Sequence, residues 1–187
     1  MMKQTIIVFV QDEPGVLNRI SRHFYRLNYN IESITAGRSE AMGVTRITIV
    51  CNHSDQYNQS LIKTQLEELN TVLNVQDITS VPSIVREYAL IKVQTQKEEK
   101  DKLSELIKNY SAKIIDSGEL ISIIETTGEM EEVESLIKSI KQFKILEIMR
   151  SGNMAMVRVD QDEHRIEIEE IDKKKGWATQ QISDALS

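Results

Sequence analysis

Apolar and polar positions change their period several times in the first half of the chain. Residues 6–10 form a continuous apolar run, which is typical of a buried strand, and the apolar positions from 16 to 27 follow the 3.6-residue period of a helix. Strand-like segments then cover 28–37 and 43–51, a second helical stripe covers 61–69, and a last strand-like run covers 72–81. The order β-α-β-β-α-β predicts a ferredoxin-like unit.

The same order of elements returns in the second half. Strand-like runs at 88–94, 112–116, 119–126 and 143–152 alternate with helical stripes at 103–110 and 130–140. The offset is 84 positions, as Ile7 against Ile91 and Ile31 against Ile115 show (91 − 7 and 115 − 31). We therefore predict an α+β protein with two tandem ferredoxin-like domains with antiparallel sheets, at 1–82 and 83–158. A charged C-terminal extension follows at 159–187.

Each predicted domain has only about 75 residues, so its own core gives marginal stability. We expect two helices to cover one face of each sheet and a partner sheet or chain to cover the other. The extension is either an exposed, partly helical appendage or a docking segment anchored by Trp177, the only tryptophan.

Composition narrows the function classes. Apolar residues make up 40% of the chain, no apolar run approaches the length of a membrane span, and the net charge of −6 disfavours nucleic acid as a partner. The single cysteine, Cys51, lies in a strand-like setting and is expected to be a small buried side chain. Three scattered histidines lack the spacing of metal ligands. The expectation is a cytoplasmic protein with no membrane, nucleic-acid or metal site.

The segment "VQDEPGVLNRI" (10–20) joins the first strand to the first helix through a Pro-Gly pair. A structural interpretation puts Pro14 at the first helical position and uses Asp12 or Glu13 to cap the helix. Gly15 fits this interpretation less well, because glycine in a first helical turn costs about 1 kcal/mol relative to alanine.

A second interpretation makes this turn a ligand site. A missing side chain at Gly15 opens the backbone N–H groups of Gly15, Val16 and Leu17, and these groups with the helix dipole favour a carboxylate. Asp12 could then bind an ammonium group. A carboxylate-binding position next to an ammonium-binding position describes a site for a free α-amino acid. The corresponding turn of the second copy, "TQKEEKDKL", has neither Pro nor Gly, so we expect no such site there.

Six segments lie in the order seen in one protein family. They are "EPGVLNRI", "YNIESIT", "TRITIV", "VREYALIKV", "IIDS" and "EIMRSG", spanning about residues 4–157. The first two resemble an ACT domain, and the set resembles the regulatory (small) subunit of acetolactate synthase. The resemblance implies two ACT-type domains, a homodimer, and feedback control of a separate catalytic large subunit by a branched-chain amino acid, usually valine.

The resemblance also implies site residues and cofactors. The effector-binding positions fall on Asp12, Glu13, Pro14, Gly15, Val16, Leu17, Asn30 and Ile31. The family usually has Asn where this chain has Asp12. Asn30 could instead simply make the turn before its strand. The thiamine diphosphate, magnesium and FAD of acetolactate synthase would belong to the large subunit, with no cofactor in this chain.

Three other function classes compete with this one. An enzyme in its own right would need a catalytic motif, and the sequence shows no catalytic triad, nucleophile elbow or phosphate loop. An RNA-binding module would need stacking aromatics on its strands, but aromatics make up only 5% of the chain. A free-standing ACT-domain amino-acid sensor acting on transcription or another enzyme would share the same pocket and differ only in its partner. The sequence leaves open which branched-chain amino acid is bound and whether the partner is activated, inhibited or both.

Overall fold

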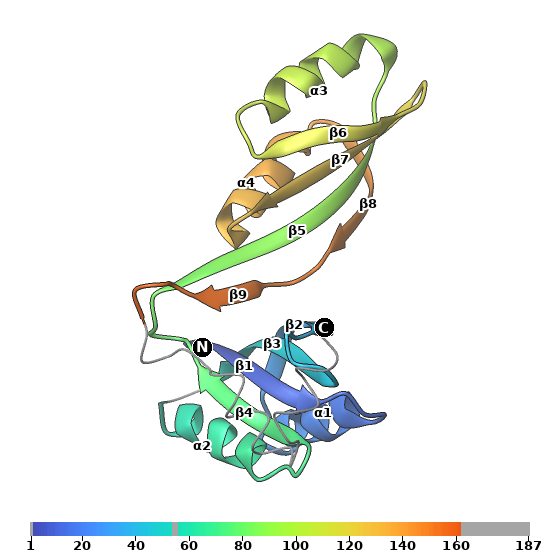
Figure 1. Ribbon diagram of the computed structural model, residues 1–187. Coiled ribbons are helices and arrows are strands. Elements are labelled where there is room, and N and C mark those ends of the chain that lie inside the picture. The colour runs from blue at the N-terminus through green and yellow to red at the C-terminus, as the bar shows by residue number, and fades with distance from the viewer. Residues whose placement is uncertain (1, 54–55, 162–187) are drawn as a thin grey trace. The chain divides into compact units, whose positions relative to one another are not determined.

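The structure is a computed structural model that describes residues 2–53 and 56–161 (Figure 1). It divides into two compact units, which are described separately. Unit 1 holds the described residues up to Ile84 and those from Ala155 on, and unit 2 holds Val85–Met154. The return of the chain to unit 1 at Ala155 precedes the expected end of the second domain at 158. The expectations for the charged extension and Trp177 concern residues outside the described part.

Unit 1 contains a four-stranded antiparallel sheet with two helices. Its elements are β1 (Met2–Gln11), α1 (Val16–Arg26), β2 (Asn30–Arg38), β3 (Val44–His53), α2 (Gln56–Glu67) and β4 (Val72–Asp77). The strand order is β2-β3-β1-β4, so β2 is an edge strand. Because β1 and β2 both run antiparallel to β3, they run parallel to each other.

The core of unit 1 lies between the sheet and its helices. Alternate β1 residues (Ile6, Val8 and Val10) are buried with residues of α1 and α2, so both helices cover one face of the sheet (Figure 1). The alternating positions of β3 that the sequence indicates, Ile47, Ile49 and Cys51, are all 0% exposed in the same core. The expected burial of Cys51 is therefore confirmed.

Burial also makes the Cys51 thiol unreactive. Desolvation, helped by the charge of Asp77, raises the pKa of Cys51 to about 12. At pH 8 only about one thiol in ten thousand is then the nucleophilic thiolate. We expect the folded chain to react with a disulfide reagent only after urea unfolds it, as followed by absorbance. Stoichiometric reaction of the folded chain within minutes would contradict this.

Unit 2 repeats the arrangement. It contains most of β5 (Ser83–Gln94), a 3-10 helix η1 (Lys97–Glu99), α3 (Lys100–Ile107), β6 (Ala112–Ser117), β7 (Ile121–Gly128), α4 (Met130–Ile140) and β8 (Lys144–Arg150). The strands follow the order β6-β7-β5-β8, and a short strand β9 (Met154–Val157) also pairs with β5. Helices α3 and α4 pack on the face that carries Ala89, Ile91, Val93 and Ile124. The predicted fold, two ferredoxin-like α+β units with antiparallel sheets, is confirmed.

A buried ion pair joins the strands of unit 2. Two nitrogens of the Arg150 guanidinium, Nε at 2.8 Å and Nη2 at 2.6 Å, donate to the carboxylate of Glu87, and the third, Nη1, donates to Glu134 of α4. Glu87 is only 3% exposed, and both oxygens of its carboxylate accept from Arg150. The pair links β5 to β8 through the segments "REYALIKV" and "RSG".

Removing this arginine should destabilise unit 2. Arg150→Met leaves the Glu87 carboxylate buried without its partner, a change that typically costs about 3 kcal/mol or more. We expect a lower urea midpoint for the unit 2 transition, measured by circular dichroism. The double variant Glu87→Gln with Arg150→Met serves as control and should recover part of the loss. Equal midpoints for parent and single variant would show that the pair contributes nothing.

Candidate functional site

The turn between β1 and α1 differs in detail from the structural interpretation of the sequence. Helix α1 begins at Val16, and Gly15 is its N-cap residue with φ 85° and ψ 0°. Pro14 therefore lies before the helix and not at its first position. A positive φ is the left-handed conformation that glycine adopts without steric cost. The positive φ alone thus explains why a glycine stands at position 15. A glycine inside the first helical turn, as the sequence suggested, had no such explanation.

The expected caps are also absent. No side chain caps α1, and its first turn holds no acidic residue. Asp12 is instead tied to the neighbouring turn between β2 and β3, where its N–H donates to the carbonyl of Gly43 at 2.9 Å and its Oδ1 accepts from the Thr45 hydroxyl at 3.2 Å. The carboxylate is exposed, belongs to a residue four positions before the start of α1, and leaves the helix terminus uncapped.

The backbone N–H groups at this terminus are mostly free. Among the described residues, those of Gly15 and Leu17 donate to no backbone carbonyl, and that of Val16 makes only a long 3.5 Å contact to Glu13. A Cβ added to Gly15 would meet nothing within 4 Å in this chain. The start of α1 therefore presents several free backbone N–H donors, and the positive end of the helix dipole lies at the same place.

The neighbouring side chains of the turn have separate roles. Val16 is 5% exposed and belongs to the core of unit 1, whereas Leu17 is 49% exposed and lies beside the free N–H groups. Glu13 and Pro14 are exposed. Of the predicted loop residues, Leu17 is thus the one that offers apolar surface to a ligand.

Asn30 is the first residue of β2, and its side chain is exposed. The turn from α1 into β2 is made by Asn28, whose φ of 57° is left-handed, so Asn30 is not needed for that turn. Ile31 is partly buried and packs its side chain against the core of unit 1.

Within one chain the two parts of the predicted site lie at opposite ends of the sheet. Asn30 pairs with Asn52 of β3, whereas Gln11, next to the Pro-Gly turn, pairs with Val44. Eight residues of β3 separate these two positions (52 − 44), which corresponds to about 26 Å at about 3.3 Å per residue. The structure therefore does not bring Asn30 and Gly15 together in a single chain.

The corresponding turn of unit 2 is already occupied by a side chain. The N–H of Gln96 donates at 2.8 Å to a carboxylate oxygen of Glu99, and the two residues form a reciprocal capping box. A ligand carboxylate would have to displace this internal carboxylate. The geometry agrees with the expectation that the "TQKEEKDKL" turn holds no amino acid, which stays a prediction.

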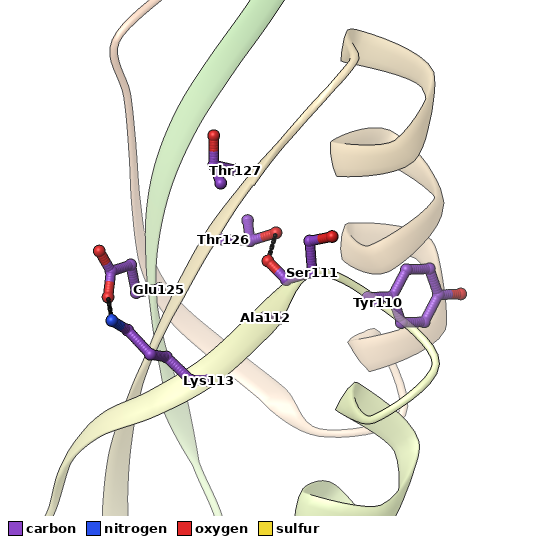
Figure 2. Close-up of a pocket in the computed structure, with 7 residues that line it drawn as sticks. All are labelled: Tyr110, Ser111, Ala112, Lys113, Glu125, Thr126 and Thr127. Atoms are coloured by element: carbon purple, nitrogen blue, oxygen red, sulfur yellow. Dashed lines mark hydrogen bonds and ion pairs between the residues drawn. The ribbon is translucent and has the colours of Figure 1, made fainter.

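Unit 2 also contains an open hollow of about 370 Å³ that the sequence did not indicate (Figure 2). It lies where the α3–β6 turn meets the end of β7, two segments that only the folded sheet brings together. The Lys113 ammonium hydrogen-bonds to Glu125 at 2.9 Å and holds the pKa of that carboxyl below its usual range. The charged groups of the hollow thus pair with each other, and the Thr126 hydroxyl donates to the carbonyl of Ser111.

Other kinds of site were sought in the described part of the chain. Residues 2–53 and 56–161 contain no group of three or more His, Cys, Asp or Glu side chains that could hold a metal ion. No helix in the same ranges is long and apolar enough to cross a membrane.

Comparisons with known proteins point to the same family in both halves of the chain. The family model described as "AHAS small subunit-like ACT domain" matches residues 6–74, and the model "Small subunit of acetolactate synthase" matches residues 86–159. A probable acetolactate synthase small subunit from Archaeoglobus fulgidus is 39% identical over 84% of this chain and 98% of its own. The acetolactate synthase small subunit of Bacillus subtilis is 37% identical over 84% of this chain and 91% of its own.

A solved structure shares the fold as well. The crystal structure of the acetolactate synthase small subunit from Thermotoga maritima superposes with a TM-score of 0.79 at 34% identity, covering 84% of this chain and 98% of that one. Both units of the present chain and the segments quoted from its sequence fall within these matches. The chain belongs to the family of acetolactate synthase small subunits.

Proposed function

We propose that this chain controls the catalytic large subunit of acetolactate synthase by binding a branched-chain amino acid, valine in the first place, in a site that two copies of unit 1 build together. The observation that carries the proposal is the uncapped, glycine-headed start of α1, whose N–H groups are free and which follows the exposed Asp12 in the same turn. Membership of the small-subunit family supports the regulatory role and the large-subunit partner.

The chemistry of the turn suits a free amino acid. The effector carboxylate accepts hydrogen bonds from the N–H groups of Gly15 and Leu17, where the helix dipole adds a favourable charge. The effector ammonium lies near Asp12, and the exposed Leu17 offers apolar contact to a branched side chain. Because Asp12 carries a full charge, it also attracts the ammonium more strongly than a neutral amide would.

The proposed homodimer would bring Asn30 of one chain to the turn of the other. Strand β2 lies at the edge of the sheet in the described part of the chain, and the proposal has a second copy pair with it. If two β2 strands pair antiparallel, the start of one strand, Asn30, lies beside the end of the other, Arg38. Arg38 pairs with Thr45, whose hydroxyl contacts Asp12, so Asn30 of one chain reaches the turn of its partner.

Helix α1 has apolar side chains on the side that this pairing would cover. His23 of α1 contacts Gln65 of α2 at 3.4 Å, which marks the side of α1 that faces α2. Leu17 and Tyr25, 49% and 84% exposed, project away from that side. A second α1 packed against them would bury both.

Feedback then needs the effector to bind two states of the complex unequally, with a coupling of typically 1–3 kcal/mol. An effector held between two chains tightens or rotates the pair, and the sheets pass this change to the large subunit. The chain itself supplies no catalytic group. The thiamine diphosphate, magnesium and FAD are expected on the large subunit, and the complex is expected in the cytoplasm.

Two measurements test this function. Calorimetry of the isolated chain against valine, leucine and isoleucine should show binding, with the affinities ranking the three effectors. An acetolactate assay with the large subunit should respond to the best of them only when this chain is present. Binding without any effect on acetolactate formation would favour the free-standing sensor, and acetolactate formation by this chain alone would refute a regulatory role.

A further inference from the structure

Three arginines line one side of α1. Arg19, Arg22 and Arg26 follow each other at spacings of three and four residues, which places them on one side of the helix, and all three are exposed. We call this side the arginine face. Helix α1 contains no acidic residue, so nothing within the helix balances these charges.

No described carboxylate balances them either. Helices α2, α3 and α4 each carry acidic as well as basic residues. Within residues 2–53 and 56–161, the ion pairs include none of the three arginines. Arg19 lies at the end of the first turn, where the helix dipole disfavours a cation, and Arg22 has a like charge one turn away in both directions. The arginine face is therefore a surface that an anionic partner would stabilise.

The proposed dimer leaves the arginine face open. At about 100° per residue, the arginines lie about 130° around the helix from Leu17 and Tyr25, which a second α1 would cover. The residues that pack into the core, Val16, Ile20 and Phe24, lie on a third side. The arginine face thus needs an occupant other than the second α1.

The C-terminal extension has the complementary charge. The family models match this chain up to residue 159, so the extension is an addition to the part that the chain shares with its family. Its stretch "DEHRIEIEEID" (162–172), which we call the acidic segment, has six acidic residues against one arginine. This net charge of −5 is most of the −6 of the whole chain, and it is concentrated in 11 residues.

The acidic segment is long enough to reach α1. The N–H of Arg158 donates to the carbonyl of Pro82 at 3.0 Å, five positions after the end of β4 at Asp77. Because β4 runs antiparallel to β1, it ends at the side of the sheet where β1 and β2 begin, and only residues 27–29 separate α1 from β2. Three strand spacings of about 4.8 Å and one layer of about 10 Å lie between, whereas 11 extended residues span about 36 Å.

We propose that the acidic segment docks on the arginine face of α1 in the same chain. Each exposed ion pair contributes little alone, but the segment is tethered to unit 1, and a tether raises its effective concentration to about the millimolar range. The docking does not depend on the proposed function, because a chain that binds no amino acid would hold its extension in the same way. It makes the extension a docking segment whose anchor is its acidic side chains and not Trp177.

Cross-linking within the full chain tests the docking. Asn18→Cys lies one turn before Arg22, and Ile168→Cys lies inside the acidic segment without changing its charge. Cys51 is buried and does not compete. In the variant with both cysteines, a short bismaleimide should join them within one chain. Adding Arg22→Glu and Arg26→Glu should slow this reaction at least about tenfold at low salt, because the segment then meets like charges.

Two further variants make the test specific. Lys102→Glu with Lys108→Glu changes two exposed charges of unit 2 by the same amount and should leave the rate within about twofold. Glu167→Lys with Glu170→Lys should slow the reaction in the chain with native arginines and restore it in the chain with reversed arginines. The second effect is a rescue by exchanged charges, which a merely structural role of the arginines would not give.

The outcomes separate three arrangements. A rate that is unchanged by reversing the arginines overturns the docking. An equal loss in the Lys102 and Lys108 variant reduces the effect to net charge and overturns it as well. Covalent dimers in place of products within one chain would put the acidic segment on the α1 of a second copy and overturn docking in the same chain. Loss in the reversed chain with rescue by the exchanged charges supports the proposal.

Discussion

The variant Gly15→Asp is expected to abolish binding of the branched-chain effector. In the proposed site the new carboxylate would stand where the effector carboxylate accepts from the N–H groups of Gly15 and Leu17, so like charges would meet and the donors would be taken. A loss of affinity of at least about 100-fold is expected, equivalent to about 2.7 kcal/mol. Calorimetry of parent and variant against valine measures it, with circular dichroism to show that the fold is kept.

Gly15→Asn is the matched control. Asn and Asp have the same shape and both tolerate the left-handed conformation that Gly15 adopts at φ 85°, but Asn adds no charge. Nothing within 4 Å in the chain obstructs a new Cβ, so neither variant should unfold. The Asn variant is expected to lose clearly less affinity than the Asp variant. Binding by Gly15→Asp as tight as in the parent would remove the turn from the effector site.

Mixing two inactive variants is expected to restore effector binding. Asn30→Ala should bind no effector as a homodimer, and neither should Gly15→Asp. In a mixed dimer, one site combines both defects, while the other combines an intact turn with an intact Asn30. Heterodimers purified with two different tags should therefore bind about half as much effector per dimer as the parent.

The same mixture decides whether the site is shared between chains. If Asn30 and the turn of one chain served the same site, every site in the mixed dimer would carry a defect and no binding would return. The acetolactate assay gives a second readout, in which Asn30→Ala keeps its association with the large subunit but loses the response to effector. Heterodimers as inactive as their parents, or full effector response by Asn30→Ala, would contradict the shared site.

The strands and helices could be predicted from sequence because their signals are local. The alternation at Ile47, Ile49 and Cys51 and the helical spacing at Ile20 and Phe24 both describe which side of an element meets the core, and the structure buries all five. The repeated order of elements then predicted two ferredoxin-like units. Periodicity predicts the buried side of each element here because each unit has a single helix-covered sheet face.

The details of the site were harder to predict. Whether Gly15 begins the helix or precedes it depends on one φ angle, which the letters "EPG" do not determine. The distance between Asn30 and the turn depends on strand register, which is a property of the whole sheet. The Arg150–Glu87 pair joins residues 63 positions apart, so no local pattern could indicate it.

The capping box at the start of η1 has a consequence for the shape of the dose response. Glu99 places a carboxylate of the chain itself on the N–H of Gln96, so we expect unit 2 to take up no metabolite carboxylate at this turn. Under the proposed function only unit 1 reads the amino-acid level, and the proposed dimer has two responsive sites, so we expect a Hill coefficient of at most two.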